Sequence, residues 1–328
     1  MERNVSMNKR IYSIILIVLM LVNCCSGCAG KGPLAYDHPY HEYYKERSRG
    51  MYSQLEGMAS NLAVISKKDQ TDKDYESDDY ADLLINDSKN EVVLSSNCFK
   101  KAYPASTTKI MTALLTLEHG DFDDKITLDH DIVMTEEGAV ISTLSKGDTV
   151  SVDDVFHTML IKSANDCAVI LAEYIAGSTE KFADMMNKRA RQLGATHTHF
   201  VNPNGLHDDD HYTTAYDMYL IFKEAVKYDK FVNTISMKSY QMTYENSLGQ
   251  TVGEYVQTTN HYLLNEYPLP EGVVMYGGKT GTTSVARSCL VLMTENESGD
   301  RFFSIVFGAK TREDLYASMT KLLEKTLN

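Results

Sequence analysis

The segment "AYPASTTKIMTALLTLEHG", residues 102–120, places a lysine where an amphipathic helix should begin. Apolar residues recur at helical spacing through its second half, which predicts a helix. Lys109 falls in the first turn, where the positive end of the helix dipole disfavours a cation. Ser106 precedes it by one turn, so the two side chains should point the same way. A neutral lysine there could take the serine's proton, although a capping serine beside a surface lysine also fits this pair alone.

Two further motifs follow in the chain. Ser163-Ala164-Asn165 falls in a break between two predicted helices, and Lys279-Thr280-Gly281 lies just before an apolar run that predicts a strand over 288–293. The ordered set S-x-x-K, S-x-N and K-T-G resembles that of the serine penicillin-recognising enzymes. Each motif is common alone, but the three together in this order are specific.

The flanking sequences resemble one branch of those enzymes, the low-molecular-mass D-alanyl-D-alanine carboxypeptidases. The resemblance covers roughly residues 82–323, and "VNPNGL" at 201–206 is typical of this family and not of β-lactamases in general. The stretches that carry it are "YPASTTKIMTALLTLE", "IKSANDCAVILAEYIAGS", "THFVNPNGLHDDDHYTTAYDM" and "GGKTGTTSVARSCLVL". Arg287 is unexpected, since small or apolar residues often stand there in relatives, and it could affect the strand edge that receives substrate.

The resemblance implies a catalytic role for three residues. Ser106 would attack the carbonyl between the two terminal D-alanines of a peptidoglycan stem peptide, and Lys109 would take the serine's proton. Ser163 would relay a proton to the departing D-alanine. Water would then release the acyl-enzyme, and β-lactams would be covalent inhibitors. No metal or organic cofactor is required by this chemistry.

The resemblance also implies a set of substrate-binding residues. Asn165 would hydrogen-bond the substrate amide or Lys109. Lys279 and Thr280 would bind the terminal carboxylate, and the backbone N–H groups of Ser106 and Thr282 would form the oxyanion hole. The full expected set is Asn165, Lys279, Thr280, Gly281 and Thr282.

Two alternatives to a carboxypeptidase stay open on the sequence. A β-lactamase would share the three motifs, and a non-hydrolysing β-lactam-binding module would share the fold. Intact motifs speak against a vestigial site. A membrane-embedded sensor would need several apolar spans, and the sequence has one apolar segment near its start.

The order of predicted elements indicates an α+β fold. Short strands at 83–86 and 92–95 precede a series of helices, and strands around "NESGD" at 296–300 precede a closing helix over 312–327. This order predicts an antiparallel sheet built from both chain ends and flanked by helices, with an all-helical insertion. "SYQMTYEN" at 239–246 alternates like a strand. The resemblance implies the DD-peptidase/β-lactamase-like fold.

The first 30 residues predict export. A basic start, an apolar run at 11–22 and small residues at 26–30 are typical of a signal peptide or an N-terminal membrane anchor, and "CSGC" makes a lipoprotein signal possible. Residues 31–81 are polar and predict a tether, followed by a catalytic domain over 82–328. We expect no C-terminal β-rich domain, membrane contact only through the N-terminus, and a location outside the cytoplasm.

Composition limits the partners. The net charge of −13 argues against nucleic acid. Three of the six cysteines lie near the signal, which excludes a disulfide-built scaffold, and Cys167 is expected to be a buried packing residue and not a nucleophile. The His- and Asp-rich runs at 197–199 and 207–211 look like metal ligands, but a polar loop explains both and no metal is expected.

Overall fold

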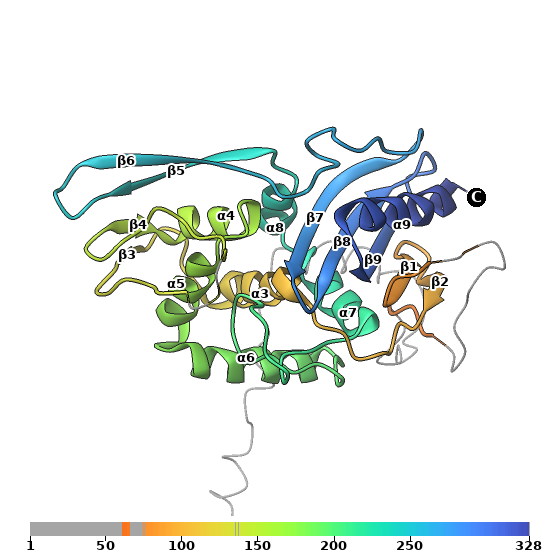
Figure 1. Cartoon of the computed structure of the whole chain (residues 1–328), viewed down its shortest axis with the longest axis horizontal. Coiled ribbons are helices and arrows are strands. Elements are labelled where there is room, and N and C mark those ends of the chain that lie inside the picture. Colours follow the sequence, from red (N-terminus) through yellow and green to blue (C-terminus); the bar gives the residue numbers. More distant parts are fainter. Residues whose placement is uncertain (1–60, 66–74, 76, 135, 137, 328) are drawn as a thin grey trace, which may run out of the picture. The chain divides into compact units, whose positions relative to one another are not determined.

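A five-stranded antiparallel sheet joins the start and the end of the folded region (Figure 1). The computed structural model describes residues 61–65, 75, 77–134, 136 and 138–327. The strand order is β2-β1-β9-β8-β7, which leaves β7 at an edge. The strands are β1 (Ala81–Asn86), β2 (Glu91–Ser96), β7 (Val274–Thr283), β8 (Arg287–Glu295) and β9 (Arg301–Ala309). This confirms the α+β class and the sheet built from both ends of the sequence.

Helices cover both faces of this sheet. The central strands β8 and β9 are buried along nearly their whole length, as their continuous apolar sequences require. Leu290 and Leu292 pack in the cluster under α9 (Arg312–Glu324), whereas Val291 and Met293 belong to the larger cluster on the opposite face. The closing helix predicted from the sequence is therefore the outer cover of the sheet.

The chain between β2 and β7 supplies the helices of the opposite face. Ser151, Ser178 and Thr214 each accept a hydrogen bond from the backbone N–H three residues ahead, which caps a helix start. These caps fix where the three helices begin. The helices are α3 (Lys109–His119), α4 (Val152–Ile161), α5 (Asn165–Ala176), α6 (Thr179–Gln192), α7 (Ala215–Ala225) and α8 (Asp229–Ile235).

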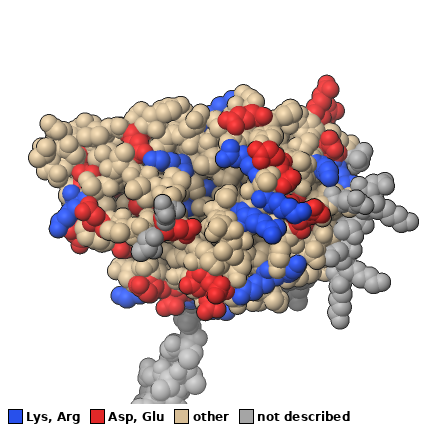
Figure 2. Space-filling model, in the orientation of Figure 1, with Lys and Arg blue, Asp and Glu red and all other residues tan. Residues whose placement is uncertain are grey.

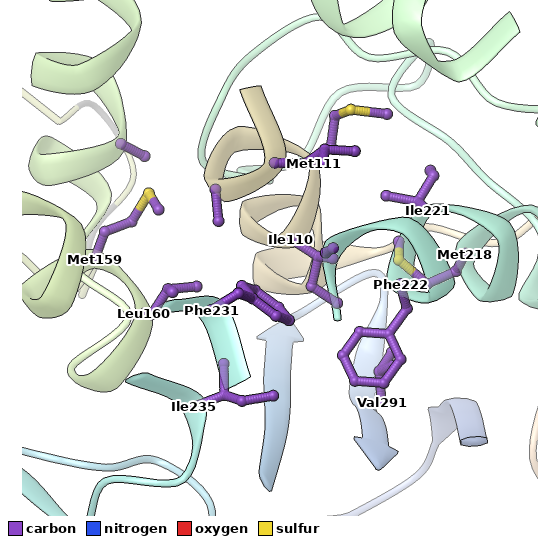
Figure 3. Close-up of a cluster of buried hydrophobic side chains, with 14 of the residues drawn as sticks. Ile110, Met111, Met159, Leu160, Met218, Ile221, Phe222, Phe231, Ile235 and Val291 are labelled. Atoms are coloured by element: carbon purple, nitrogen blue, oxygen red, sulfur yellow. The ribbon is translucent and has the colours of Figure 1, made fainter. Parts of the chain in front are cut away.

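Helix α3 lies in the middle of the larger cluster. Ile110 and Met111 on α3 are surrounded by side chains from α4, α7, α8 and β8 (Figure 3). The first two turns, Lys109 to Thr116, are buried on every side. Because this packing fixes α3 against its neighbours, it also fixes the Ser106 turn that leads into it.

A second sheet corrects the expectation of an all-helical insertion. Four antiparallel strands lie in the order β3-β4-β5-β6 beside α4 (Figure 1). Of these, the alternation at 239–246 predicted only β5. Two strands have three residues, and β6 contains a glycine and is largely exposed, so no apolar alternation marks them. The strands are β3 (Lys125–Thr127), β4 (Thr149–Ser151), β5 (Ser239–Glu245) and β6 (Thr251–Gln257).

Parts of the expected tether contact the folded region. Ala63 and Tyr75 are buried. The Ala63 N–H donates to Tyr219 Oη at 3.2 Å, and Tyr216 Oη donates to the Ala63 carbonyl at 2.9 Å. The expected export segment, residues 1–30, lies outside the described residues. Within the described residues, no helix combines the length and the apolarity needed to cross a bilayer.

Candidate active site

Ser106 lies on a short 3-10 turn that runs directly into α3. The turn spans Ala105–Thr108, so the serine is not within the α-helix itself, and no side chain caps this helix start. Thr107 Oγ1 donates to the Pro104 carbonyl at 2.7 Å. Ala105 has a φ of 48°, a left-handed conformation that non-glycine residues rarely adopt and that often marks functional sites. Ser106 remains partly exposed at the surface of this turn.

Lys109 is completely buried, and its side-chain nitrogen contacts three oxygens. Lys109 Nζ lies 2.9 Å from Ser106 Oγ, 2.8 Å from Asn165 Oδ1 and 2.7 Å from the Asn204 carbonyl oxygen. Burial lowers the pKa of Lys109 well below its usual value, and the neighbouring Lys279 charge lowers it further. A neutral amine has two N–H donors and one lone pair. The two amide oxygens can take both N–H groups, leaving the lone pair for the Ser106 O–H.

The Asn204 contact was not predicted from the sequence. Asn204 and Gly205 belong to the "VNPNGL" stretch, which marked the family but gave no sign that a backbone carbonyl would hold the lysine. Gly205 has a φ of +85°, and a Cβ there would lie 1.9 Å from the Ala105 carbonyl oxygen. Only glycine fits at this approach, so the stretch packs directly against the nucleophile turn.

Ser163 and Lys279 form a second pair of a hydroxyl and a lysine nitrogen. Lys279 Nζ donates to Ser163 Oγ at 2.9 Å and to the Thr280 carbonyl at 3.0 Å. Burial alone lowers the pKa of Lys279 to about 7. Ser163 has a φ of 66°, so the break between α4 and α5 holds it in a left-handed conformation. The strained backbone of Ser163 and the hydrogen bond from Lys279 on β7 therefore fix the direction of the Ser163 hydroxyl.

Strand β7 carries the K-T-G motif past the nucleophile turn. The sequence placed this motif before a strand, whereas it lies inside one, because β7 extends to Thr283 and pairs with β8. A Cβ on Gly281 would meet the Ser106 nitrogen at 2.8 Å and the Pro104 oxygen at 2.9 Å. Only a glycine allows this approach. Thr282 is exposed at the edge of the sheet, beside the Ser106 turn.

Thr280 has a partner that the sequence did not reveal. Its Oγ1 lies 2.5 Å from Thr259 Oγ1, on the segment between β6 and β7. This contact fixes the rotamer of a hydroxyl expected to bind the substrate carboxylate. No local pattern connects residues 21 positions apart in the chain.

A loop before β4 forms hydrogen bonds with the start of α5. The Asn165 backbone N–H and side-chain Nδ2 both donate to the Val140 carbonyl, at 2.8 and 3.0 Å. Asp166 accepts the Ser142 backbone N–H at 2.9 Å and its hydroxyl at 2.5 Å. The amide of Asn165 is thus oriented with its oxygen toward Lys109.

Glu254 connects the second sheet to this loop. Glu254 on β6 pairs with Lys162, the residue before Ser163, and this pair is largely buried. Its other carboxylate oxygen accepts from the Thr143 backbone N–H at 2.9 Å and from the Thr143 hydroxyl at 3.0 Å. The sheet that the sequence did not predict therefore supports the residue beside Ser163.

The histidine-rich loop and Cys167, which the sequence did not assign to a metal site or a nucleophile, have structural roles. His211 is buried, accepts the Val201 N–H at 3.1 Å on Nδ1, and so donates from Nε2 to Thr108 Oγ1 at 2.8 Å. Burial raises the pKa of the Cys167 thiol well above its usual value, which keeps it unreactive. Among the described residues, no group of three His, Cys, Asp or Glu side chains is arranged to hold a metal ion.

Known proteins resemble this chain in sequence. The family described as D-alanyl-D-alanine carboxypeptidase, peptidase family S11, matches residues 66–311. D-alanyl-D-alanine carboxypeptidase DacF of Bacillus subtilis is 35% identical over 74% of this chain and 60% of its own length. DacC of Escherichia coli is 32% identical over 74% of this chain and 59% of its own length. The chain thus spans about 60% of the curated relatives it matches.

Solved structures share the fold. A cefotaxime-bound penicillin-binding protein of Listeria monocytogenes is 27% identical, with a TM-score of 0.64 over 78% of this chain and 99% of that one. A Streptomyces DD-transpeptidase has a TM-score of 0.68 over 77% of this chain and 98% of that one, at 22% identity. These structures confirm the expected DD-peptidase fold. From the matched profile, the relatives and the fold, the chain belongs to the D-alanyl-D-alanine carboxypeptidase family, peptidase family S11.

Proposed function

We propose that this protein removes the terminal D-alanine from peptidoglycan stem peptides through an acyl-enzyme on Ser106. The observation that carries the proposal is the Lys109 contact set. A buried amine with a lowered pKa lies 2.9 Å from a partly exposed serine oxygen, and amide oxygens take its two N–H groups. This is the arrangement that general-base activation of a serine needs.

The first half of the reaction forms the acyl-enzyme. Ser106 Oγ attacks the carbonyl carbon of the penultimate D-alanine while its proton passes to Lys109. The backbone N–H groups of Ser106 and Thr282 stabilise the oxyanion, and the close approach at Gly281 keeps β7 beside the serine turn. Ser163, held by Lys279, delivers a proton to the amide nitrogen, and the C–N bond breaks to release D-alanine.

Substrate binding uses the edge of the sheet. β7 is the terminal strand of its sheet, so its outer backbone groups are open to an extended peptide. Lys279 and Thr280 bind the terminal carboxylate, with the Thr280 hydroxyl fixed by Thr259. Asn165 holds Lys109 and reaches the substrate amide. Water then hydrolyses the ester and returns Ser106 to its free state.

We also propose that the domain acts outside the cytoplasm, attached through its N-terminal segment or released by cleavage there. The basic start and apolar run at residues 1–22 support this proposal. Intact-mass analysis of the protein from its host tests it: a diacylglycerol adduct on Cys28 supports a lipoprotein, an intact Met1 supports an anchor, and a start beyond residue 30 supports secretion. A cytoplasmic, unprocessed protein would contradict export.

The test of the activity combines product release with covalent labelling. The protein should release D-alanine from an N-acylated peptide ending in D-Ala-D-Ala, and a fluorescent penicillin should label Ser106. Ser106→Ala should abolish both, while Ser247→Ala, in the exposed turn between β5 and β6, should retain both. Mass spectrometry of the labelled protein locates the adduct. Labelling that persists in Ser106→Ala would refute the assignment of the nucleophile.

A further inference from the structure

The hydroxyls of Thr259 and Thr280 meet beside the edge strand of the main sheet. Their Oγ1 atoms lie 2.5 Å apart, a short hydrogen bond between two hydroxyls. Thr259 lies on the segment that leads from β6 to β7, and Thr280 lies on β7 itself, the terminal strand of its sheet. Both residues are partly exposed. A ligand at this edge can therefore reach the pair from solvent.

The pair keeps one O–H group for a ligand. Within the described part of the chain, neither hydroxyl has a second hydrogen-bond partner. A hydroxyl carries one hydrogen and two lone pairs, so one threonine donates to the other and the other keeps its hydrogen. If Thr259 is the donor, the free hydrogen is on Thr280. Thr280 is the residue proposed to bind the terminal carboxylate, so this direction leaves the useful donor at the substrate.

Thr259 is held in place by contacts on both sides of it in the chain. Before it, the Thr258 N–H donates to the Lys238 carbonyl at 2.9 Å. After it, the His261 N–H donates at 2.8 Å to Oη of Tyr316, a buried residue of α9. Because the backbone is fixed from two different elements, the Thr259 hydroxyl has a defined position before substrate arrives.

A carboxylate at Thr280 sets the direction of the hydrogen bond between the two threonines. Figure 2 shows basic side chains near the middle of the face on which β7 ends in Figure 1, so an anion can approach there despite the net charge of −13. A carboxylate only accepts, so Thr280 must donate to it and is left with lone pairs for the Thr259 O–H. Hydrogen bonds linked in this way polarise one another, so each strengthens the other.

We infer that Thr259 is a positioning residue for the terminal carboxylate of the substrate and acts through Thr280. Its O–H donates to Thr280 Oγ1, which fixes the Thr280 rotamer and turns the Thr280 O–H toward the carboxylate. Thr259 itself does not touch the substrate. The inference rests on the proposed function, in which Thr280 binds that carboxylate. Because the carboxylate stays bound while the peptide bond breaks, Thr259 contributes to binding and not to the chemical step.

Steady-state kinetics of D-alanine release separate this role from a general structural one. Thr259→Val keeps the shape of the side chain and removes the hydroxyl. KM for an N-acylated peptide ending in D-Ala-D-Ala should rise about five-fold with kcat nearly unchanged, as loss of uniform binding requires. Thr259→Ser restores the hydroxyl and should recover most of the loss. Thr251→Val, at an exposed position of β6, is the matched control and should behave like the parent protein.

A double-mutant cycle decides whether Thr259 acts through Thr280. The cycle uses the second-order rate of acylation by a fluorescent penicillin, which also carries a carboxylate, in single-turnover experiments that measure slow variants as well. Thr280→Val should slow acylation about ten-fold or more, and Thr259→Val about five-fold. In the Thr280→Val background, Thr259→Val should have no further effect, because its partner is already absent. If the two effects multiply, Thr259 binds the carboxylate independently and the positioning role is wrong.

The outcomes separate this inference from the proposed function. A KM for Thr259→Val equal to that of the parent, a loss that Thr259→Ser does not recover, or normal acylation of Thr280→Val overturns the role of Thr259. In each of these cases, D-alanine release by the parent protein still supports the carboxypeptidase. Absence of D-alanine release by the parent protein overturns both.

Discussion

Lys109 Nζ lies 2.9 Å from Ser106 Oγ, and neither of its other two contacts carries a negative charge. Without a carboxylate partner, a fully buried ammonium is costly, so the neutral amine is favoured. The position at the start of α3 acts in the same direction, because the helix dipole repels a cation there. The feature that made this lysine anomalous in the sequence is the one that suits it to be a base.

The pH dependence of acylation should report the pKa of Lys109. Acylation needs the neutral amine, so the rate should rise with pH and fall as Lys109 becomes protonated. Lys279 lowers that pKa through its positive charge, although burial has the larger effect. Lys279→Gln removes the charge, so the pKa of Lys109 should rise and the acid limb should move to higher pH.

Stopped-flow acylation by a fluorescent penicillin across pH measures this limb. Lys89→Gln, which removes a distant charge, should leave it in place. If the acid limb of the pH–rate profile does not shift in Lys279→Gln, or shifts to lower pH, another group is the base.

Gly205 offers a test of how closely the nucleophile turn is packed. Gly205→Ala places a Cβ 1.9 Å from the Ala105 oxygen, at a φ of +85°. Gly249→Ala is the matched control, since its φ is +75° and nothing lies within 4 Å of the added atom. Both variants bear the cost of a left-handed alanine, about 1 kcal/mol. Only Gly205→Ala must also displace the Ser106 turn.

We expect Gly249→Ala to acylate normally. Gly205→Ala should lose a further 1–3 kcal/mol or so of unfolding free energy, as overpacked sites do. It should also acylate roughly a hundred-fold more slowly, because displacements near 1 Å have such effects. Urea unfolding and penicillin acylation measure the two quantities. If the two variants have the same unfolding free energy and the same acylation rate, the Ser106 turn accommodates the added Cβ without loss of stability or activity.

The sequence predicted those parts of the molecule that local patterns encode. The apolar runs of β8 and β9 identified their strands, and the three motifs identified residues that the fold brings together. It did not predict the second sheet, whose strands β3 and β4 are too short to show alternation. It also missed Asn204, Thr259 and Glu254 as partners, because their contacts join segments distant in the chain and only packing creates them.

His211 should make stability depend on pH. Burial lowers its pKa to about 3, with Asp208 opposing this and His199, His207 and Lys109 adding to it. The unfolded chain binds a proton near the ordinary pKa of 6.5, which the folded chain does not, so stability falls as pH drops below that value. Between pH 7 and pH 5 the loss from this group is about 2 kcal/mol.

His211→Gln keeps an N–H donor for Thr108 but cannot titrate. Urea unfolding at the two pH values should therefore show a loss smaller by about that amount than in the parent protein. His119→Gln, at the exposed end of α3, should behave like the parent. If His211→Gln loses as much stability as the parent on acidification, the buried imidazole takes up its proton in the folded state as well.

The persistence of the penicilloyl-enzyme should separate this protein from a β-lactamase. Class A β-lactamases clear their acyl-enzyme with a glutamate that activates water. Here residues 194–210, the segment after the S-x-N helices, contain no glutamate, and the Asn204 carbonyl from that segment contacts Lys109. Asp208 to Asp210 are exposed, and Asp208 Oδ1 accepts the Asp210 N–H at 2.8 Å as part of a turn.

An opened β-lactam also stays attached beside the ester, whereas D-alanine leaves and lets water approach. We therefore expect the penicilloyl-enzyme to persist from minutes to hours while a D-Ala-D-Ala peptide turns over repeatedly. Chase labelling with unlabelled penicillin measures the release rate, and D-alanine assays on the same preparation measure turnover. Penicillin release at many turnovers per second would contradict the carboxypeptidase and favour a β-lactamase, because it would require a water-activating group that the contacts around Ser106 and Lys109 do not supply.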